Sequence, residues 1–294
     1  MSQALPEQIT FYGRDDFGVV QVRAKDHQRW LTFGNDVEQS CIDIRHPYSP
    51  VHVYLHGMLI APLTLAAPKQ LAILGLGGGT LANALNQLFP DSLIDGVDHR
   101  QLVIDAALSA CGLEPHDNLT LHCTDANDFI EQSQTSYDVI FTDLYEANGA
   151  HELQTQQAFM ATCAEKLSDQ GVLVANQWAS EFRDSQKAHA ALNAVFGDQV
   201  IYLQVAGGNT IAFDYKHALP DLKRDAFYEH AQTAELKIIA IYNAKHAPFG
   251  DRMQKHYKQG VIANALNRWF YSAVEPAFYP NSLNAFYIND LTHA

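Results

Sequence analysis

The sequence predicts an α/β fold with a mostly parallel, seven-stranded sheet, a small β domain before it and helices after it. From about residue 70, short apolar runs alternate with amphipathic stretches, which is typical of parallel strands joined by helical crossovers. The last two runs are joined by the short sequence AGGN, which favours a hairpin, so an antiparallel pair is expected at one edge. We therefore divide the chain into three predicted domains, at residues 1–47, 48–218 and 219–294.

The first 45 or so residues are expected to form a small sheet. The runs at residues 17–23 and 29–33 are rich in β-branched or alternating apolar residues, and a polar turn separates them. Residues 48–67 are mostly apolar and contain prolines at positions 50 and 62, so we predict one helix that ends near Pro62.

The central domain follows with its alternating elements, and a helical extension is expected after residue 220. An aromatic tail ends the chain, for which packing in a core or oligomer and closure over the pocket are both open interpretations. The predicted strands begin at residues 70, 92, 119, 137, 171, 200 and 210; the predicted helices cover residues 80–88, 100–111, 126–132, 153–167, 181–196, 221–242 and 252–273.

Composition excludes several classes of protein. The chain has 19 Lys and Arg against 33 Asp and Glu, a net charge of −14, which argues against binding nucleic acid. The longest apolar stretch, residues 57–68, is too short to span a membrane, and no signal peptide is apparent. Four scattered cysteines indicate a reduced, cytoplasmic protein. His52 and His56 lack a third ligand nearby in sequence, so no metal site is predicted.

Polar residues or glycines follow most of the predicted strands. In an open α/β sheet, ligands bind beyond the carboxyl ends of the strands, so these residues are candidates for one pocket. They are Gly75, Gly77, Gly78 and Gly79, then Asp98, Asp125, Asp143 with Glu146, and Gln177.

Each candidate has a chemical use. A glycine loop brings backbone N–H groups close to a ligand. Asp98 is placed to bind a ribose hydroxyl, and Asp125 can accept from the exocyclic amine of adenine or instead cap the next helix. Asp143 and Glu146, three residues apart, can hold a cationic amine and remove its proton.

With these motifs the sequence resembles the polyamine aminopropyltransferase (spermidine synthase) family over about residues 12 to 215. The resemblance implies a Rossmann-like methyltransferase fold, decarboxylated S-adenosylmethionine as donor, an amine acceptor such as putrescine, and assembly as a homodimer. It rests on Gln39, the segment His56-Gly57-Met58-Leu59, the turn Gly78-Gly79-Thr80-Leu81, Asp98, Asp125-Ala126, the run YDVIFTDLYE and Gln177.

The resemblance also implies residue roles. Asp143 matches the base that accepts the proton of the attacking amine. Asp125 and Ala126 match the adenine site, and Glu146 stands where the family has a second Asp. Tyr54, Gln39, His56 and Gln177 are expected on the amine side.

Three glycines occupy positions where the family has an acidic residue: Gly57, Gly77 and Gly96. Without a carboxylate at position 77, the donor's ammonium loses its counter-ion and a donor carboxylate is no longer repelled. Ordinary S-adenosylmethionine is therefore the alternative donor, with methyl or related alkyl transfer as the alternative activity. A non-catalytic nucleoside-binding protein is the third alternative, and the retained Asp125, Asp143 and Glu146 count against it.

Overall fold

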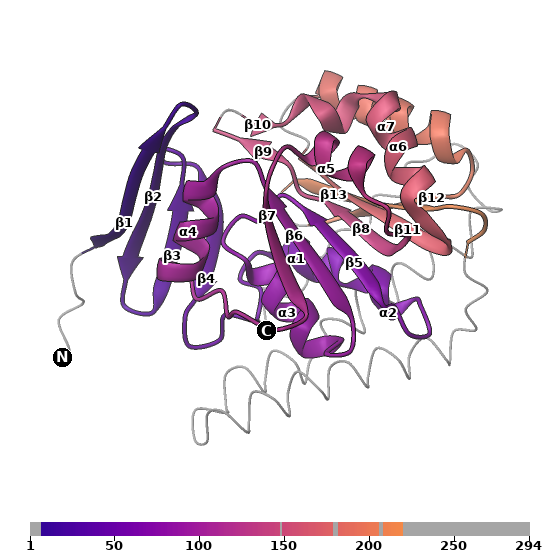
Figure 1. Cartoon of the computed structure of the whole chain (residues 1–294). Helices are drawn as coiled ribbons and strands as arrows, with labels where there is room; N and C mark the ends of the chain where they lie inside the picture. Colours follow the sequence, from indigo (N-terminus) through magenta and orange to yellow (C-terminus); the bar gives the residue numbers. More distant parts are fainter. Residues whose placement is uncertain (1–6, 148, 179–181, 206–207, 220–294) are drawn as a thin grey trace, which may run out of the picture.

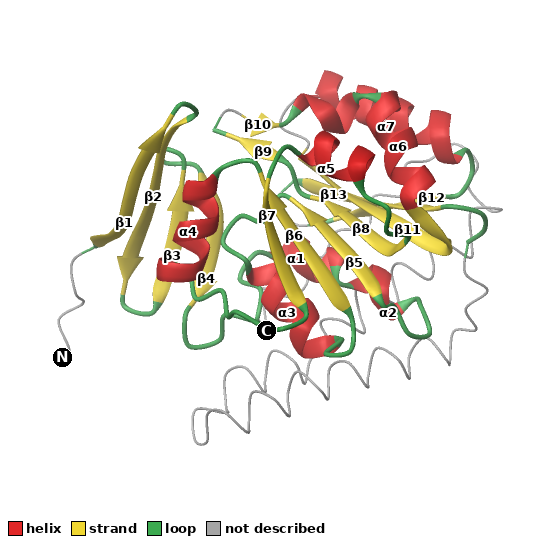
Figure 2. Ribbon diagram, viewed as in Figure 1, coloured by secondary structure: helices red, strands yellow, loops and turns green. Residues whose placement is uncertain are grey.

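The computed structural model describes residues 7–147, 149–178, 182–205 and 208–219 (Figure 1). These residues form a four-stranded sheet at the N-terminus and a seven-stranded sheet with helices on both faces (Figure 2). The predicted fold class is confirmed. The helices and the aromatic tail predicted after residue 220 lie outside the described residues.

The N-terminal sheet is an antiparallel meander in the order β1-β2-β3-β4. Val20, Val22, Leu31 and Ile42 alternate along its strands and are buried against the helix α4 (Gln101–Ala110). Two of its strands match the predicted runs, and the other two lie outside them. The strands are β1 (Gln8–Asp15), β2 (Gly18–Lys25), β3 (Gln28–Thr32) and β4 (Glu38–Asp43).

The central sheet has the order β12-β13-β11-β8-β5-β6-β7. Its strands from β7 to β11 are parallel, and β13 is antiparallel to both of its neighbours, so the predicted antiparallel pair at the edge is confirmed. The strands are β5 (Gln70–Leu74), β6 (Leu93–Asp98), β7 (Leu119–Cys123), β8 (Tyr137–Thr142), β11 (Leu167–Trp178), β12 (Val200–Gln204) and β13 (Asn209–Tyr215).

Helices bury both faces of the central sheet, which explains why its strands are apolar on both sides (Figure 2). One face packs on α1 (Val53–Met58), α2 (Ile60–Leu63), α3 (Thr80–Leu88) and α4. The other face packs on α5 (Ala126–Gln132), α6 (Gln157–Lys166) and α7 (Phe182–Phe196).

Two predicted helices are divided in the structure. The helix expected over residues 48–67 is instead the short pair α1 and α2, because Pro50 disfavours helix in the residue before it and Pro62 lacks a backbone donor. The helix expected over residues 153–167 is a 3₁₀ turn, η1 (Glu152–Thr155), followed by α6, since Gln156 between them is extended.

A small hairpin of β9 (Tyr145–Glu146) and β10 (Gly149–Ala150) follows β8 and was not predicted. In the part of the chain that the structure describes, we find no helix of the length and apolarity that crossing a membrane requires.

Candidate active site

A cavity lies at the carboxyl ends of the parallel strands, with one wall from the N-terminal sheet. Most of the predicted site residues line it: Asp143, Tyr54 and Gln39, the four loop glycines, and Asp98, Asp125 and Ala126. The described residues that line it are Phe33, Gln39, Ser40, Cys41, His52, Tyr54 and Leu55, residues 75–81, Val97, Asp98, His99, residues 124–126, residues 143–145, His151 and Leu153.

The glycine loop after β5 allows two segments of backbone to lie unusually close together. Gly75 has φ +99°, and a Cβ added there would lie 2.1 Å from the carbonyl oxygen of Asp143. On the other side of the loop, the N–H of Gly78 donates to Oγ of Ser40 on β4, at 2.9 Å. The loop therefore joins the N-terminal sheet to the segment that carries Asp143.

Asp98 is the last residue of β6, Asp125 follows the neighbouring strand β7, and both line the cavity. Asp98 accepts from the backbone N–H of Arg100 at 3.0 Å, and burial raises its pKa above the ordinary value. Asp125 caps α5 by accepting from the N–H groups of Asn127 (2.8 Å) and Asp128 (3.3 Å), and it also lines the cavity. The two interpretations of Asp125, cap and ligand contact, are thus compatible.

Asp143 follows β8 and is held by two side-chain donors. The hydroxyl of Tyr54 donates to Oδ2 at 3.0 Å, and the amide Nδ2 of Asn176 donates to Oδ1 at 2.8 Å. The amide of Asn209 in turn donates to Oδ1 of Asn176 at 2.9 Å, which fixes the orientation of that amide.

The surroundings of Asp143 suit a general base. Burial raises its pKa to about 6, although the hydrogen bonds from Asn176 and Tyr54 act in the opposite direction. A carboxylate with this pKa is ionised at neutral pH and is a stronger proton acceptor than an ordinary aspartate. Burial and the nearby Asp143 also raise the pKa of Tyr54, so its hydroxyl stays a donor.

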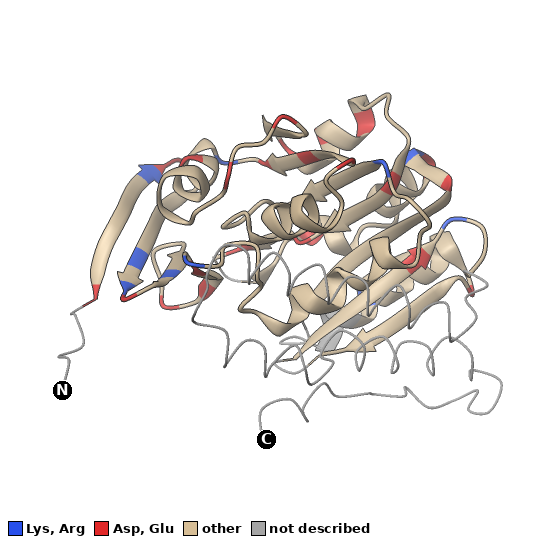
Figure 3. Cartoon of the chain, turned by 90° about the horizontal axis from the view of Figure 1, so that it is seen from below, with Lys and Arg blue, Asp and Glu red and all other residues tan. Residues whose placement is uncertain are grey.

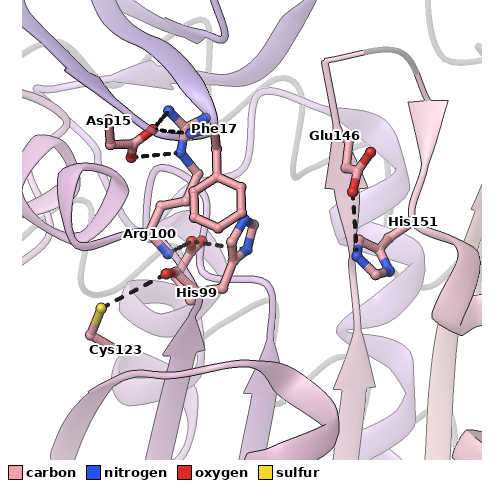
Figure 4. A network of polar contacts seen from close by, with 8 residues as sticks. Asp15, Phe17, His99, Arg100, Cys123, Glu146 and His151 are labelled. Carbon is pink, nitrogen blue, oxygen red and sulfur yellow. Dashed lines mark hydrogen bonds and ion pairs between the residues drawn. The ribbon is translucent and has the colours of Figure 1, made fainter.

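Three predicted site residues are not among the described residues that line the cavity. Glu146 has a side chain that is 60% exposed and lies 3.3 Å from Nε2 of His151, as Figure 4 shows. His56 is buried with Nε2 2.9 Å from the carbonyl oxygen of Pro50. Gln177 is buried, and neither atom of its amide has a hydrogen-bond partner within the described residues.

Several side chains at the site were not among the predicted residues. Asn176 directly precedes Gln177, and strand alternation sends neighbouring side chains to opposite faces. Ser40 and Phe33 come from the N-terminal sheet, whose residues precede the pocket strands by many positions. His52 and His151 also line the cavity, where His52 stacks on Tyr54 and His151 pairs with Glu146. Neither histidine belongs to a sequence motif that predicts a site.

The charge around the cavity is acidic. Among the described residues that line it there is Asp98, Asp125 and Asp143 but no Lys or Arg. Figure 3 shows that Lys and Arg are sparse over the whole described part, while Asp and Glu are spread over its loops and helices. Within the described ranges, no group of three or more His, Cys, Asp or Glu side chains is arranged to hold a metal ion.

The sequence model of the spermine/spermidine synthase domain family matches residues 55–206 of this chain. This range includes the glycine loop, Asp98, Asp125 and Asp143. The chain belongs to this family. Family members are transferases, and the match covers more than half of the chain.

The chain is similar to curated proteins named as aminopropyltransferases and as methyltransferases. The chain is 29% identical to a polyamine aminopropyltransferase of Chromobacterium violaceum over 194 residues, or 66% of this chain and 74% of the relative. The polyamine aminopropyltransferase of Vibrio vulnificus is 28% identical over 244 residues, 81% of this chain and 79% of the relative. The human eEF1A lysine and N-terminal methyltransferase is 27% identical over 187 residues, 59% of this chain but 26% of that protein.

Solved structures agree on the fold. A probable spermidine synthase from Corynebacterium glutamicum superposes with a TM-score of 0.64 at 18% identity, covering 78% of this chain and 87% of that one. Human methyltransferase-like protein 13, in complex with SAH, gives a TM-score of 0.55 at 23% identity, covering 64% of this chain and 92% of that one.

Proposed function

We propose that the protein transfers an aminopropyl group from decarboxylated S-adenosylmethionine to an amine acceptor such as putrescine. The observation that carries this proposal is the placement of Asp143. It is a half-buried carboxylate with two fixed donors, in the same cavity as the glycine loop, Asp98 and Asp125. Relatives named as polyamine aminopropyltransferases support the choice of reaction.

The residues fit the two halves of such a reaction. Asp98 and the loop glycines can hold the ribose, and Asp125 with Ala126 can meet the adenine. The acidic lining favours a cationic sulfonium donor and a cationic amine. His52 stacks on Tyr54 with ring centres 5.7 Å apart, and with Gln39 these residues line the cavity in which the acceptor would approach Asp143.

In the proposed step the amine nitrogen bonds to the aminopropyl carbon next to sulfur, and the carbon–sulfur bond breaks. The bonding electrons go to sulfur, which leaves as the neutral thioether of methylthioadenosine. The acceptor amine, with a pKa of about 10, must give up a proton to attack, and Asp143 accepts it. Tyr54 and Asn176 keep the carboxylate oriented toward the cavity while this happens.

S-adenosylmethionine-dependent methyl transfer is the second candidate function. It is favoured by Gly77, where no carboxylate is available and an added Cβ would lie 2.8 Å from Oγ of Ser40. The human methyltransferase relative is consistent with this candidate. A non-catalytic role would not require the ordered hydrogen bonds around Asp143.

One set of measurements separates these functions. Calorimetry would measure binding of methylthioadenosine, S-adenosylmethionine and its decarboxylated form. A separate assay would then measure turnover with putrescine and with spermidine as acceptor. We expect the decarboxylated donor to bind more tightly than S-adenosylmethionine; the reverse order would replace aminopropyl transfer with the second candidate. Binding of none of the three would remove both enzymatic functions.

The Asp143→Asn variant tests the proposed base. We expect donor binding close to wild type and loss of turnover, because the amide keeps the shape of the side chain but cannot accept the amine proton at neutral pH. Loss of donor affinity instead would assign Asp143 to the nucleoside half of the cavity.

Assembly as a homodimer in the cytoplasm is also a prediction, and light scattering would check the dimer.

A further inference from the structure

The two walls of the cavity come from different sheets, and one arginine outside the cavity is bonded to both. The N-terminal sheet supplies Gln39 and Ser40 from β4 and Phe33 from the turn after β3, and the end of β6 and the next residue supply Asp98 and His99. Arg100 comes next and is the N-cap residue directly before α4. Its side chain is bonded to the N-terminal sheet, while its backbone is bonded to Asp98.

The guanidinium of Arg100 is almost entirely buried, with 4% exposed, and its partners all belong to the N-terminal sheet and its first turn. Nε donates to Oδ2 of Asp15 at 3.0 Å, and Nη2 donates to Oδ1 at 2.7 Å and to the carbonyl oxygen of Gly18 at 3.0 Å. Its central carbon lies 4.9 Å from the centre of the Phe33 ring. Figure 4 shows this fork between Arg100 and Asp15.

A second contact joins the turn after β1 to His99, the residue between Asp98 and Arg100. The exposed ring of Phe17 meets His99 edge-on, with ring centres 4.7 Å apart (Figure 4). Asp15 fixes the turn that carries this ring, because its Oδ1 also accepts from the N–H of Phe17 at 3.0 Å. The hydrogen bonds from Arg100 lower the pKa of Asp15, so the pair is ionised at neutral pH.

The backbone of Arg100 faces the other wall. Its N–H donates to Oδ1 of Asp98 at 3.0 Å, and its carbonyl accepts the first hydrogen bonds of α4, from Val103 and Ile104. A buried guanidinium is costly unless its donors are satisfied, so Arg100 favours the one placement of the N-terminal sheet that provides Asp15 and Gly18. That placement and the orientation of Asp98 are therefore coupled through one residue.

We infer that Arg100, paired with Asp15, is a positioning residue for donor binding, which holds the N-terminal wall against the segment that carries Asp98. This inference rests on the proposed nucleoside site but not on the identity of the transferred group. It predicts that a change at Asp15, the last residue of β1 and outside the cavity, weakens binding of a nucleoside.

The test measures binding of methylthioadenosine by calorimetry to the full chain and to the variants Asp15→Asn, Arg100→Lys and Asp15→Glu. We expect Asp15→Asn and Arg100→Lys to raise Kd about fivefold or more, a typical coupling between linked sites, with kcat at saturating donor within about twofold of wild type. Asp15→Glu should recover part of the affinity, because it restores a charged partner for the fork. The Asp15→Asn/Arg100→Lys double variant should lose no more than the worse single variant.

The matched control is Asp36→Asn. Asp36 pairs with Arg23 at 3.6 Å, and both residues belong to the N-terminal sheet and its turns, so the same chemical change leaves the two walls joined. We expect the wild-type Kd for this control. Thermal melts of every variant identify any that does not fold, and Asp15→Glu keeps a carboxylate for the buried guanidinium of Arg100.

Four results would overturn the inference: a folded Asp15→Asn variant with wild-type Kd, an equal loss in Asp36→Asn, additive losses in the double variant, or a fall in kcat and stability at unchanged Kd. If the wild-type protein itself does not bind methylthioadenosine, the proposed function fails first. Binding to wild type with no effect of the variants removes only the role of Arg100.

Discussion

Replacing Tyr54 with Phe removes one of the two hydrogen bonds to Asp143 and leaves the aromatic ring in place. Tyr54 donates to Oδ2 of Asp143 at 3.0 Å and so favours the ionised carboxylate, whose pKa is about 6 in the intact site. A hydrogen bond to a charged group contributes about 1.5–3 kcal/mol. At 1.36 kcal/mol for each pH unit, its loss should raise the pKa of Asp143 by about one to two pH units.

The rate should follow this pKa. A base acts only when ionised, so activity declines as the pH falls below its pKa, and the variant should decline at a higher pH than wild type. At pH 7 we expect kcat/KM to fall about 2- to 10-fold, and near pH 9 to return toward wild type. The assay is kcat/KM for methylthioadenosine production between about pH 5 and pH 9.

Tyr202→Phe serves as the control for this profile, because the Tyr202 hydroxyl donates to Asn193 at 3.2 Å, away from the cavity. Its acidic limb should coincide with that of wild type. If Tyr54→Phe lowers the rate equally at every pH, the hydroxyl acts on the acceptor and the reasoning about Asp143 is refuted.

Three further variants test other features. Asp214 is fully buried, and burial raises its pKa in the folded protein well above the ordinary value of 3.8. At a pH between the unfolded and folded pKa values, the folded state therefore holds one more proton than the unfolded state. The free energy of unfolding then falls by about 1.4 kcal/mol for each unit by which the pH rises. Asp214→Asn should remove this slope, and urea melts that show the same difference from wild type at pH 5 and pH 8 would contradict it. Gly75→Ala should lower the free energy of unfolding by more than about 2 kcal/mol, because the alanine Cβ would lie 2.1 Å from the carbonyl oxygen of Asp143. Gly197→Ala is the control and should cost less, since Gly197 also has a positive φ, +59°, but has open space around it. Glu146→Gln should change the acceptor KM less than about threefold, since this carboxylate is 60% exposed and paired with His151; a larger rise would place Glu146 in the amine site.

The sequence was most informative where local pattern and tertiary structure agree. The helices α3 and α5 begin and end at the predicted residues because each follows a strand and starts at a glycine turn or at the capping Asp125. The ends of parallel strands also located Asp98 and Asp143, since topology alone brings those positions to one edge.

Other features depended on geometry that one strand cannot reveal. The pattern of polar strand ends predicts Gln177, but its neighbour Asn176 is the residue that bonds Asp143. The sequence does not specify which side of β11 faces Asp143. The contribution of Ser40 and the Asp15–Arg100 pair depends on how two sheets pack, because the residues of that pair are 85 positions apart.

The position of β13 has a consequence for the order in which the fold is completed during synthesis. This strand is synthesised after β12 yet inserts between β12 and β11, and it carries Asn209, which orients the amide of Asn176 on Asp143. A nascent chain that has emerged only as far as residue 206, where the family match ends, would hold the glycine loop and Asp143 but leave β12 without its partner strand. The hydrogen bonds that orient the side chain of Asp143 are therefore complete only after β13, the last strand of the described sheet, has been synthesised.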